Sequence, residues 1–99
     1  MSEFYMKAVG VTFGNSQRVI RGLSVGEQVR FVREPNNPYD RYAVRIETLS
    51  GERIGHVSRD YSQQMSTNIA NGINYRVYVS SVTGGGFNSN YGVNLRVVY

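Results

Sequence analysis

The residues best suited to chemistry lie in one short segment, VREPNNPYD, which runs from Val32 to Asp40. Tyr39 offers a flat ring and Asp40 a carboxylate, and Pro38 precedes them directly. Proline has a fixed φ and no amide proton, and it pushes the residue before it toward extended backbone. The two preceding asparagines can bond their own backbone and tighten a turn. We therefore expect a stiffened corner that presents a ring beside a carboxylate, an arrangement that suits ligand binding.

A purely structural role fits the same residues. In that alternative the corner is only a well-made turn, in which Asp40 caps backbone amides and Tyr39 covers an edge of the core. The local pattern does not decide between a turn and a binding device, so both interpretations stay open at this point.

The composition suits a nucleic-acid partner. The formal net charge is +4, and the eleven basic residues are ten arginines and one lysine, beside eight tyrosines. Guanidinium groups bind phosphates through paired hydrogen bonds and stack on flat rings. Arginine together with tyrosine and positive charge is typical of nucleic-acid binding. The alternative is an ordinary basic surface on a small β protein, and charge alone slightly favours it because +4 is modest.

Length and residue usage limit the other classes. Ninety-nine residues predict a single domain over 1–99 with one modest core. There is no cysteine, which excludes disulfides and thiolate metal sites. No apolar run approaches the ~20 residues of a membrane span, and the first residues lack the layout of a secretion signal. We expect a cytoplasmic protein that has no membrane partner.

Hydrophobic alternation predicts about six short strands, at residues 3–13, 27–33, 42–48, 53–57, 73–82 and 93–99. A short helical turn is expected at 15–21, and one principal helix at 58–71 with Ser58 as its N-cap. Such a mostly β chain predicts a small, strongly bent sheet or partly open barrel. The first strand should turn three residues to one face: Val9, Val11 and Phe13. The principal helix should bury an apolar stripe made of Tyr61, Met65, Ile69 and Ala70.

Evidence for an enzyme is weak. The chain has one histidine, His56, and no pattern typical of a hydrolytic triad or a phosphate-binding loop. Asp40, His56 and Asp60 could hold a divalent ion, as in a metal-dependent nuclease, but their spacing matches no ligand signature. We expect a non-enzymatic protein without cofactor or metal, and keep the nuclease as the less favoured hypothesis.

Single-stranded nucleic acids bind to aromatic platforms beside a basic track. Aromatic residues fall at the expected strand ends and loops, namely Phe13, Tyr39, Tyr42, Phe87 and Tyr91. Arginines are near them in sequence, namely Arg33, Arg41, Arg53 and Arg59. Phe87 and Tyr91 belong to a glycine-rich segment, TGGGFNSNYG, which we expect to form a mobile hairpin loop.

The sequence resembles the HIRAN domain family from about residue 7 to residue 98. The likeness is carried by three motifs: AVGVTF at 8–13, VREPNNPYDRYAVRI at 32–46 and GERIGHVSRD at 51–60. It implies a modified β-barrel akin to an oligonucleotide-binding or SH3-like barrel. It also implies capture of the 3′ end of single-stranded DNA. This is the role of the family members that lie at the N-terminus of Swi/Snf-type helicases, which remodel stalled replication forks.

The resemblance implies a role for each site residue. Tyr39 and Asp40 would form the end-binding pocket, with Tyr39 packed on the terminal nucleotide and Asp40 accepting from the 3′-hydroxyl. Three further positions match the family by alignment: a stacking ring at Phe13, a phosphate contact at Arg59 and its neighbour His56. A further aromatic at the pocket rim matches Tyr91 more loosely.

The chain departs from the helicase members at two positions. Thr12 stands where they have an arginine, and Phe13 where they have a tyrosine, so one phosphate contact and one hydroxyl are missing. Weaker DNA binding is therefore expected. The alternative function is a protein-interaction or small-ligand adaptor with a redirected pocket, for example in conflict between phage and host, and a protein partner stays open in either case.

Overall fold

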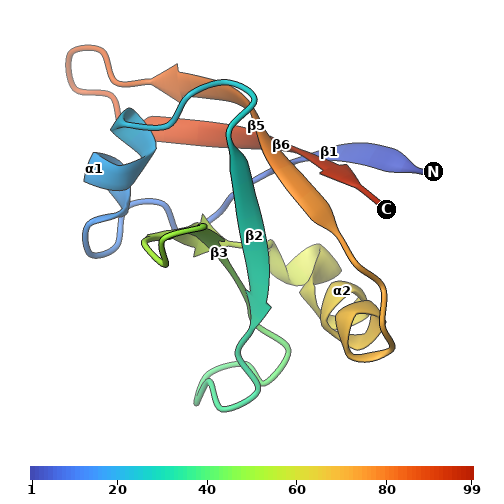
Figure 1. The fold of residues 1–99 in the computed structure, drawn as a ribbon. Coiled ribbons are helices and arrows are strands. Elements are labelled where there is room, and N and C mark those ends of the chain that lie inside the picture. The colour runs from blue at the N-terminus through green and yellow to red at the C-terminus, as the bar shows by residue number, and fades with distance from the viewer.

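Six antiparallel strands and two helices make up the computed structural model, which describes residues 1–99 (Figure 1). The strands form one sheet in the order β1-β6-β5-β2-β3-β4. In chain order the elements are β1 (Glu3–Lys7), α1 (Ser16–Arg21), β2 (Gln28–Arg33), β3 (Val44–Thr48), β4 (Arg53–His56), α2 (Arg59–Ala70), β5 (Arg76–Gly84) and β6 (Tyr91–Val98). Neither helix is long and apolar enough to cross a membrane.

The two edges of the sheet meet at one point. Beyond the end of β1, Val9 pairs in antiparallel fashion with His56 at the end of β4. Each backbone N–H of this pair donates to the carbonyl of the other residue, both at 2.9 Å. The sheet is therefore a strongly bent, OB-like half-barrel whose edge strands touch, and the predicted fold class is confirmed.

A glycine permits this close approach. A Cβ at Gly55 would lie 2.5 Å from the carbonyl oxygen of Val9, nearer than real Cβ atoms come to other heavy atoms. It would also press on the side chain of Val11, at 3.3 Å. Only a residue without a side chain fits between the two edges, so the bridge depends on Gly55.

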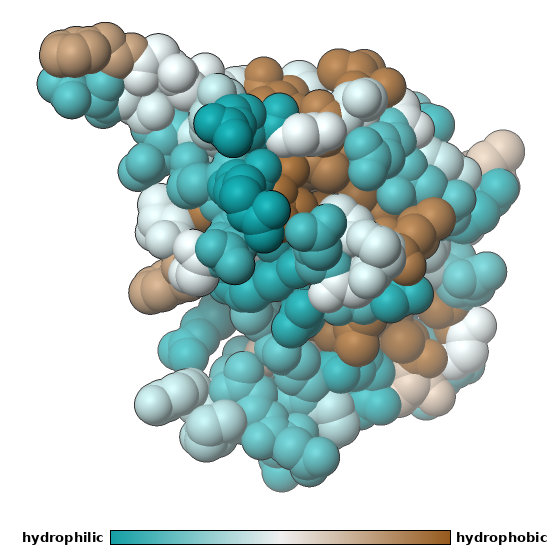
Figure 2. Space-filling model, turned by 60° about the vertical axis from the view of Figure 1, so that its left-hand side comes forward, coloured by the Kyte–Doolittle hydropathy of each residue, from teal (hydrophilic) through white to brown (hydrophobic).

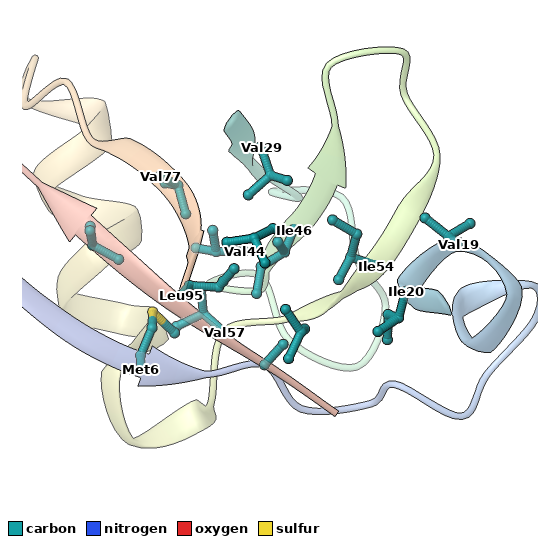
Figure 3. Close-up of a cluster of buried hydrophobic side chains, with 14 of the residues drawn as sticks. Met6, Val19, Ile20, Val29, Val44, Ile46, Ile54, Val57, Val77 and Leu95 are labelled. Atoms are coloured by element: carbon teal, nitrogen blue, oxygen red, sulfur yellow. The ribbon is translucent and has the colours of Figure 1, made fainter. Parts of the chain in front are cut away.

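The core fills the inside of the bent sheet, where α1 and both halves of the sheet contribute side chains (Figure 3). Its largest fully buried side chains are Ile20, Ile46, Ile54 and Leu95. The alternation predicted for β3 and β6 is confirmed, because their inward residues are buried: Val44, Ile46, Thr48, Val93, Leu95 and Val97. Tyr99, expected on the same face, is half exposed.

The predicted inner face of the first strand is wrong. The strand ends at Lys7, and the buried residues here are Met6 and the following Ala8. Val9 and Phe13 are exposed, and of the three predicted residues Val11 alone packs partly against the core. The chain leaves the sheet after Val9 through Gly10, whose φ is +64°. Beyond that glycine the residues form a turn rather than a strand, so the period of two ends there and Phe13 points outward.

The predicted apolar stripe of α2 is also wrong in part. Met65 is buried and Ile69 half-buried, but Tyr61 and Ala70 are exposed. The helix instead buries two serines, Ser62 and Ser66, beside Met65. Small side chains let the helix lie close to the sheet, and hydropathy does not identify such a face.

The remaining elements follow the prediction closely. Ser58 caps α2 by accepting from the N–H of Asp60 at 3.3 Å. The helical turn expected at 15–21 is α1, and Gly22 follows it. The glycine-rich hairpin loop is shorter than expected, because β5 extends to Gly84 and β6 begins at Tyr91.

Substitution of Gly55 tests the closure of the sheet. Gly55→Ala is expected to lower the free energy of unfolding by about 1–3 kcal/mol, because the added methyl group overlaps the Val9 carbonyl. Urea denaturation followed by circular dichroism measures the change. Gly86→Ala is the matched control, since a Cβ there meets nothing within 4 Å. Equal stability of the two variants would contradict the role of Gly55.

Candidate nucleic-acid interface

The corner between β2 and β3 is organised by one asparagine side chain. The Oδ1 atom of Asn37 accepts from the backbone N–H of Tyr39 at 2.9 Å and from that of Asp40 at 3.2 Å. The Asn37 N–H donates to the carbonyl of Glu34 at 3.0 Å. These bonds hold the corner in one shape and leave Tyr39 87% exposed. Tyr39 therefore does not cover the core, as the turn-only alternative required.

Asp40 combines the two roles considered for it. Its Oδ1 accepts from the backbone N–H of Tyr42 at 2.9 Å and so closes the turn. Its Oδ2 faces α2 and lies 3.9 Å from the Nε atom of Arg59. The Asp40 side chain is 21% exposed. One oxygen of the carboxylate is thus used by the turn, while the other remains open to a further donor.

His56 ties the corner to the closed edge of the sheet. Its Nε2 bonds to Oε1 of Glu34 at 2.5 Å, and its Nδ1 lies 3.0 Å from Nη2 of Arg53. Arg53 in turn donates from Nη1 to the carbonyl of Gly10 at 2.9 Å and to Oγ of Ser16 at 2.6 Å. A continuous chain of polar contacts therefore joins the corner, β4 and the segment after β1.

A β-bulge places Arg53 and His56 on the same side of β4. The register of the β3–β4 pair shifts between Ile46 and Glu47, so that β4 has one residue more than β3. Side chains three apart on a regular strand point to opposite faces. The additional residue, Ile54, enters the core and returns His56 to the side on which Arg53 lies.

Phe13 lies at the other end of this network. It is 68% exposed, and its ring centroid is 6.0 Å from the guanidinium carbon of Arg53. Through Arg53 and His56, the exposed ring of Phe13 is connected to the corner that presents Tyr39. Two exposed rings are thus carried by one rigid polar network.

Tyr91 makes no direct contact with the other five predicted residues. Its backbone is held by Gln17, which accepts from the Tyr91 N–H at 2.7 Å and donates to the Tyr91 carbonyl at 3.0 Å. Its ring packs on the backbone of Gly85. Together with Arg18 and Arg21 it lines a separate cleft of about 360 Å³. No hydrogen bond, ion pair or ring contact joins it to the corner.

The corner residues form an open surface rather than an enclosed pocket. A polar groove of about 390 Å³ runs along residues 33–38. Tyr39, Asp40 and Arg59 do not line it, and they line none of the other three hollows of the surface. The lower end of the molecule, where the segment between β2 and β3 lies, is hydrophilic in Figure 2. A ligand would therefore lie on exposed rings, not inside a cavity.

Two pKa values are changed by the network. Partial burial works to raise the pKa of Glu34, but the hydrogen bond and charge of His56, with help from Asn37 and Arg45, bring it below its ordinary value near 4.5. Burial, followed by the charge of Arg45, lowers the pKa of Arg53. Glu34 is therefore held as a carboxylate that accepts from His56.

Glu34 was not predicted as a site residue from the sequence. It is the one acidic residue between Glu27 and Asp40, and it follows the strand that leads into the corner. An isolated acid within the same segment as the binding residues, in a chain with a single histidine, was the available signal.

Asp40, His56 and Asp60 do not form a metal site, since no group of three acidic or histidine side chains is placed to hold an ion.

Comparisons with known proteins identify the family and the fold. The family model of the HIRAN domain matches residues 1–99. The helicase-like transcription factor of Mus musculus is 35% identical over 57 residues, and that of Homo sapiens is 32% identical over 57 residues. In both cases the alignment covers 50% of this chain and 6% of the relative. The chain thus matches only a small part of these long proteins.

Solved structures share the fold. The crystal structure of the HIRAN domain of human HLTF superposes with a TM-score of 0.77 at 21% identity, covering 97% of this chain and 73% of that one. A protein from Lactobacillus plantarum superposes with a TM-score of 0.71 at 20% identity, covering 99% of this chain and 100% of that one. Identity at this level establishes a common architecture.

The lowered pKa of Glu34 gives a test in acid. Its stabilising contribution is complete above the ordinary pKa near 4.5 and is lost as the pH falls through the lower pKa of the folded state. Glu34→Gln should therefore be less stable than the wild type by about 1–2 kcal/mol at neutral pH, and the difference should shrink in acid.

Urea denaturation across this pH range measures the difference. Glu52→Gln is the control, because the Glu52 carboxylate contacts only an exposed arginine, Arg18, at 3.9 Å and otherwise takes no hydrogen bond. A stability difference for Glu34→Gln that does not change with pH would contradict the assignment.

Proposed function

The chain belongs to the HIRAN domain family, and from the surface that its fold builds we propose that it is a non-enzymatic module binding the 3′-hydroxyl end of single-stranded DNA. The observation that carries the proposal is the rigid corner, where an exposed ring at Tyr39 lies next to an Asp40 carboxylate with one oxygen free of the turn. A chain end that offers a sugar, a base and a hydroxyl matches this pair of groups.

Selectivity for an unphosphorylated end follows from Asp40. A carboxylate accepts a hydrogen bond from the terminal 3′-hydroxyl, and hydrogen bonds to charged acceptors are stronger than neutral ones. A terminal phosphate brings a second negative charge to the same half-buried place and is repelled. The site therefore recognises the chemistry of the end without reading a base.

Tolerance of sequence follows from the rings. Tyr39 and Phe13 are both mostly exposed, and each base stacked on such a ring contributes about 1–3 kcal/mol whatever its identity. The last base would stack on Tyr39, and a neighbouring base would reach Phe13. His56 and Arg53 contact each other, and they also bond to Glu34 and to the Gly10 carbonyl. Their role is therefore to position the two segments that carry the rings.

Arg59 supplies the phosphate contact. It begins α2, its side chain is 77% exposed, and its ion-pair partner is Asp40 at 3.9 Å. This is too long for a tight ion pair, so the guanidinium keeps donors free for a backbone phosphate. A phosphate bound there would lie beside the carboxylate that accepts the terminal hydroxyl, as the last nucleotide of a strand requires.

Asp40→Asn is expected to abolish the preference for a free 3′-hydroxyl. The asparagine Oδ1 can still accept from the Tyr42 N–H and keep the turn, while the negative charge that repels a phosphate is gone. Fluorescence anisotropy with one labelled oligonucleotide, ending in a 3′-hydroxyl or in a 3′-phosphate, measures the preference.

The wild type should bind the hydroxyl end at least about tenfold more tightly, the equivalent of 1.4 kcal/mol. Asp60→Asn is the control. It removes the same charge from the first turn of α2 and should keep the preference. Equal binding of both ends by the wild type would refute end capture, even if both bind well.

Arg59→Ala is expected to weaken binding and to lower its dependence on salt. Each phosphate contact in a single strand contributes roughly 0.7 to the slope of log affinity against log salt concentration, so the slope should fall by about this amount. Arg76→Ala removes an arginine from β5, where no acidic partner contacts it, and should leave the slope nearly unchanged. An unaltered slope in Arg59→Ala would place this residue away from the DNA.

A further inference from the structure

The largest hollow of the surface lies away from the corner, on the other side of α2. It has a volume of about 450 Å³, which is within the size range of small-ligand sites. Its wall is formed by α2, β1, the segment before β5 and the end of the chain after β6. The residues that line it include Phe4, Asp60, Tyr61, Gln64, Tyr75 and Tyr99.

Aromatic side chains make up half of the residues that line this cleft. The Tyr99 ring meets that of Tyr75 edge-on, with centroids 5.2 Å apart, and that of Phe4 at 6.0 Å. The hydroxyl of Tyr75 accepts from Nδ2 of Asn68 at 2.8 Å, which fixes its ring. Tyr61 stands beside them on α2 and is half exposed. The rings are therefore held in a cluster in which several faces and edges are open to a ligand.

The charge of the cleft is opposite to that of the chain. Although the protein carries eleven basic residues and a net charge of +4, no lysine or arginine lines the cleft. The one charged lining residue is Asp60, whose carboxylate has neither an ion-pair partner nor a hydrogen-bond donor. An unpaired carboxylate beside aromatic rings repels phosphate and attracts a cation.

We propose that this cleft binds an arginine side chain of a partner protein. A guanidinium group is planar and stacks on aromatic rings, and it forms paired hydrogen bonds with a carboxylate. Asp60 would accept those bonds, while Tyr61 and Tyr99 would provide ring surface. The side-chain amide of Gln64 offers a further acceptor oxygen at the rim.

The first turn of α2 then separates two binding surfaces. Arg59 lies toward Asp40 and the corner, whereas the next residue, Asp60, lines the aromatic cleft. Successive helical residues point about 100° apart, so the two side chains serve different faces. The cleft does not share a residue with the proposed DNA surface, and the inference holds whether or not the chain binds DNA.

A peptide titration tests the proposal. The probe is a five-residue peptide, blocked at both ends, with one arginine between glycines. Its control carries citrulline, which has nearly the shape of arginine without the charge. In ¹H–¹⁵N NMR spectra of the whole chain, the arginine peptide should shift backbone signals of Tyr61, Gln64 and Tyr99. The citrulline peptide should bind at least about tenfold more weakly, as the loss of a charge-assisted contact predicts.

Two variants make the result decisive. Asp60→Asn and Tyr61→Leu change side chains that are exposed, and each should weaken the arginine peptide by about tenfold. Arg59→Ala should bind the peptide as the wild type does. Equal binding of the two peptides, shifts located elsewhere, no shift at millimolar peptide, or unchanged affinity in both variants would overturn the proposal. Oligonucleotide binding by Asp60→Asn should stay unchanged, which keeps this result distinct from that at the corner.

Discussion

The antiparallel bridge between Val9 and His56 is the contact on which both the fold and the proposed site depend. Its two backbone hydrogen bonds join the edges of the bent sheet, and Gly55 leaves the space for them. The side chain of the same histidine bonds to Glu34 on one side and to Arg53 on the other. Closure of the half-barrel is therefore coupled to the placement of the exposed groups, because His56 takes part in both.

This coupling explains how a small protein can hold a binding surface on loops. Loops are usually the most variable parts of a fold, and binding residues on them must be positioned by a rigid scaffold. Here side-chain hydrogen bonds hold the loops. Arg53 of β4 donates to the Gly10 carbonyl, and Asn37 accepts from the backbone amides of the corner. The backbone segments that carry the two exposed rings are therefore held before any ligand arrives, so less ordering entropy is lost on binding than with a free loop.

Much of the architecture could be predicted from residue patterns, because strand alternation and helix capping are local. The buried residues of β3 and the Ser58 cap are examples. The failures are those in which tertiary packing overrides a local rule. The first strand ends early because Val9 makes a single pair with β4 and the chain then turns away at Gly10. The helix α2 buries Ser62 and Ser66 because small side chains allow close approach. Neither cause is visible in hydropathy.

The site was predictable to the extent that its residues are close in sequence. Tyr39 and Asp40 are presented by a corner that Pro38 and the asparagines already indicated. The placement of Arg53 beside His56 could not be foreseen, because it requires one additional residue in β4 and therefore a pairing register. Strand pairing also decides where Tyr91 lies. Tyr91 pairs with Gly84 at the end of the β5–β6 hairpin, where Gln17 of α1 binds its backbone. Sequence motifs thus identify which groups are offered, while strand pairing decides which of them share a surface.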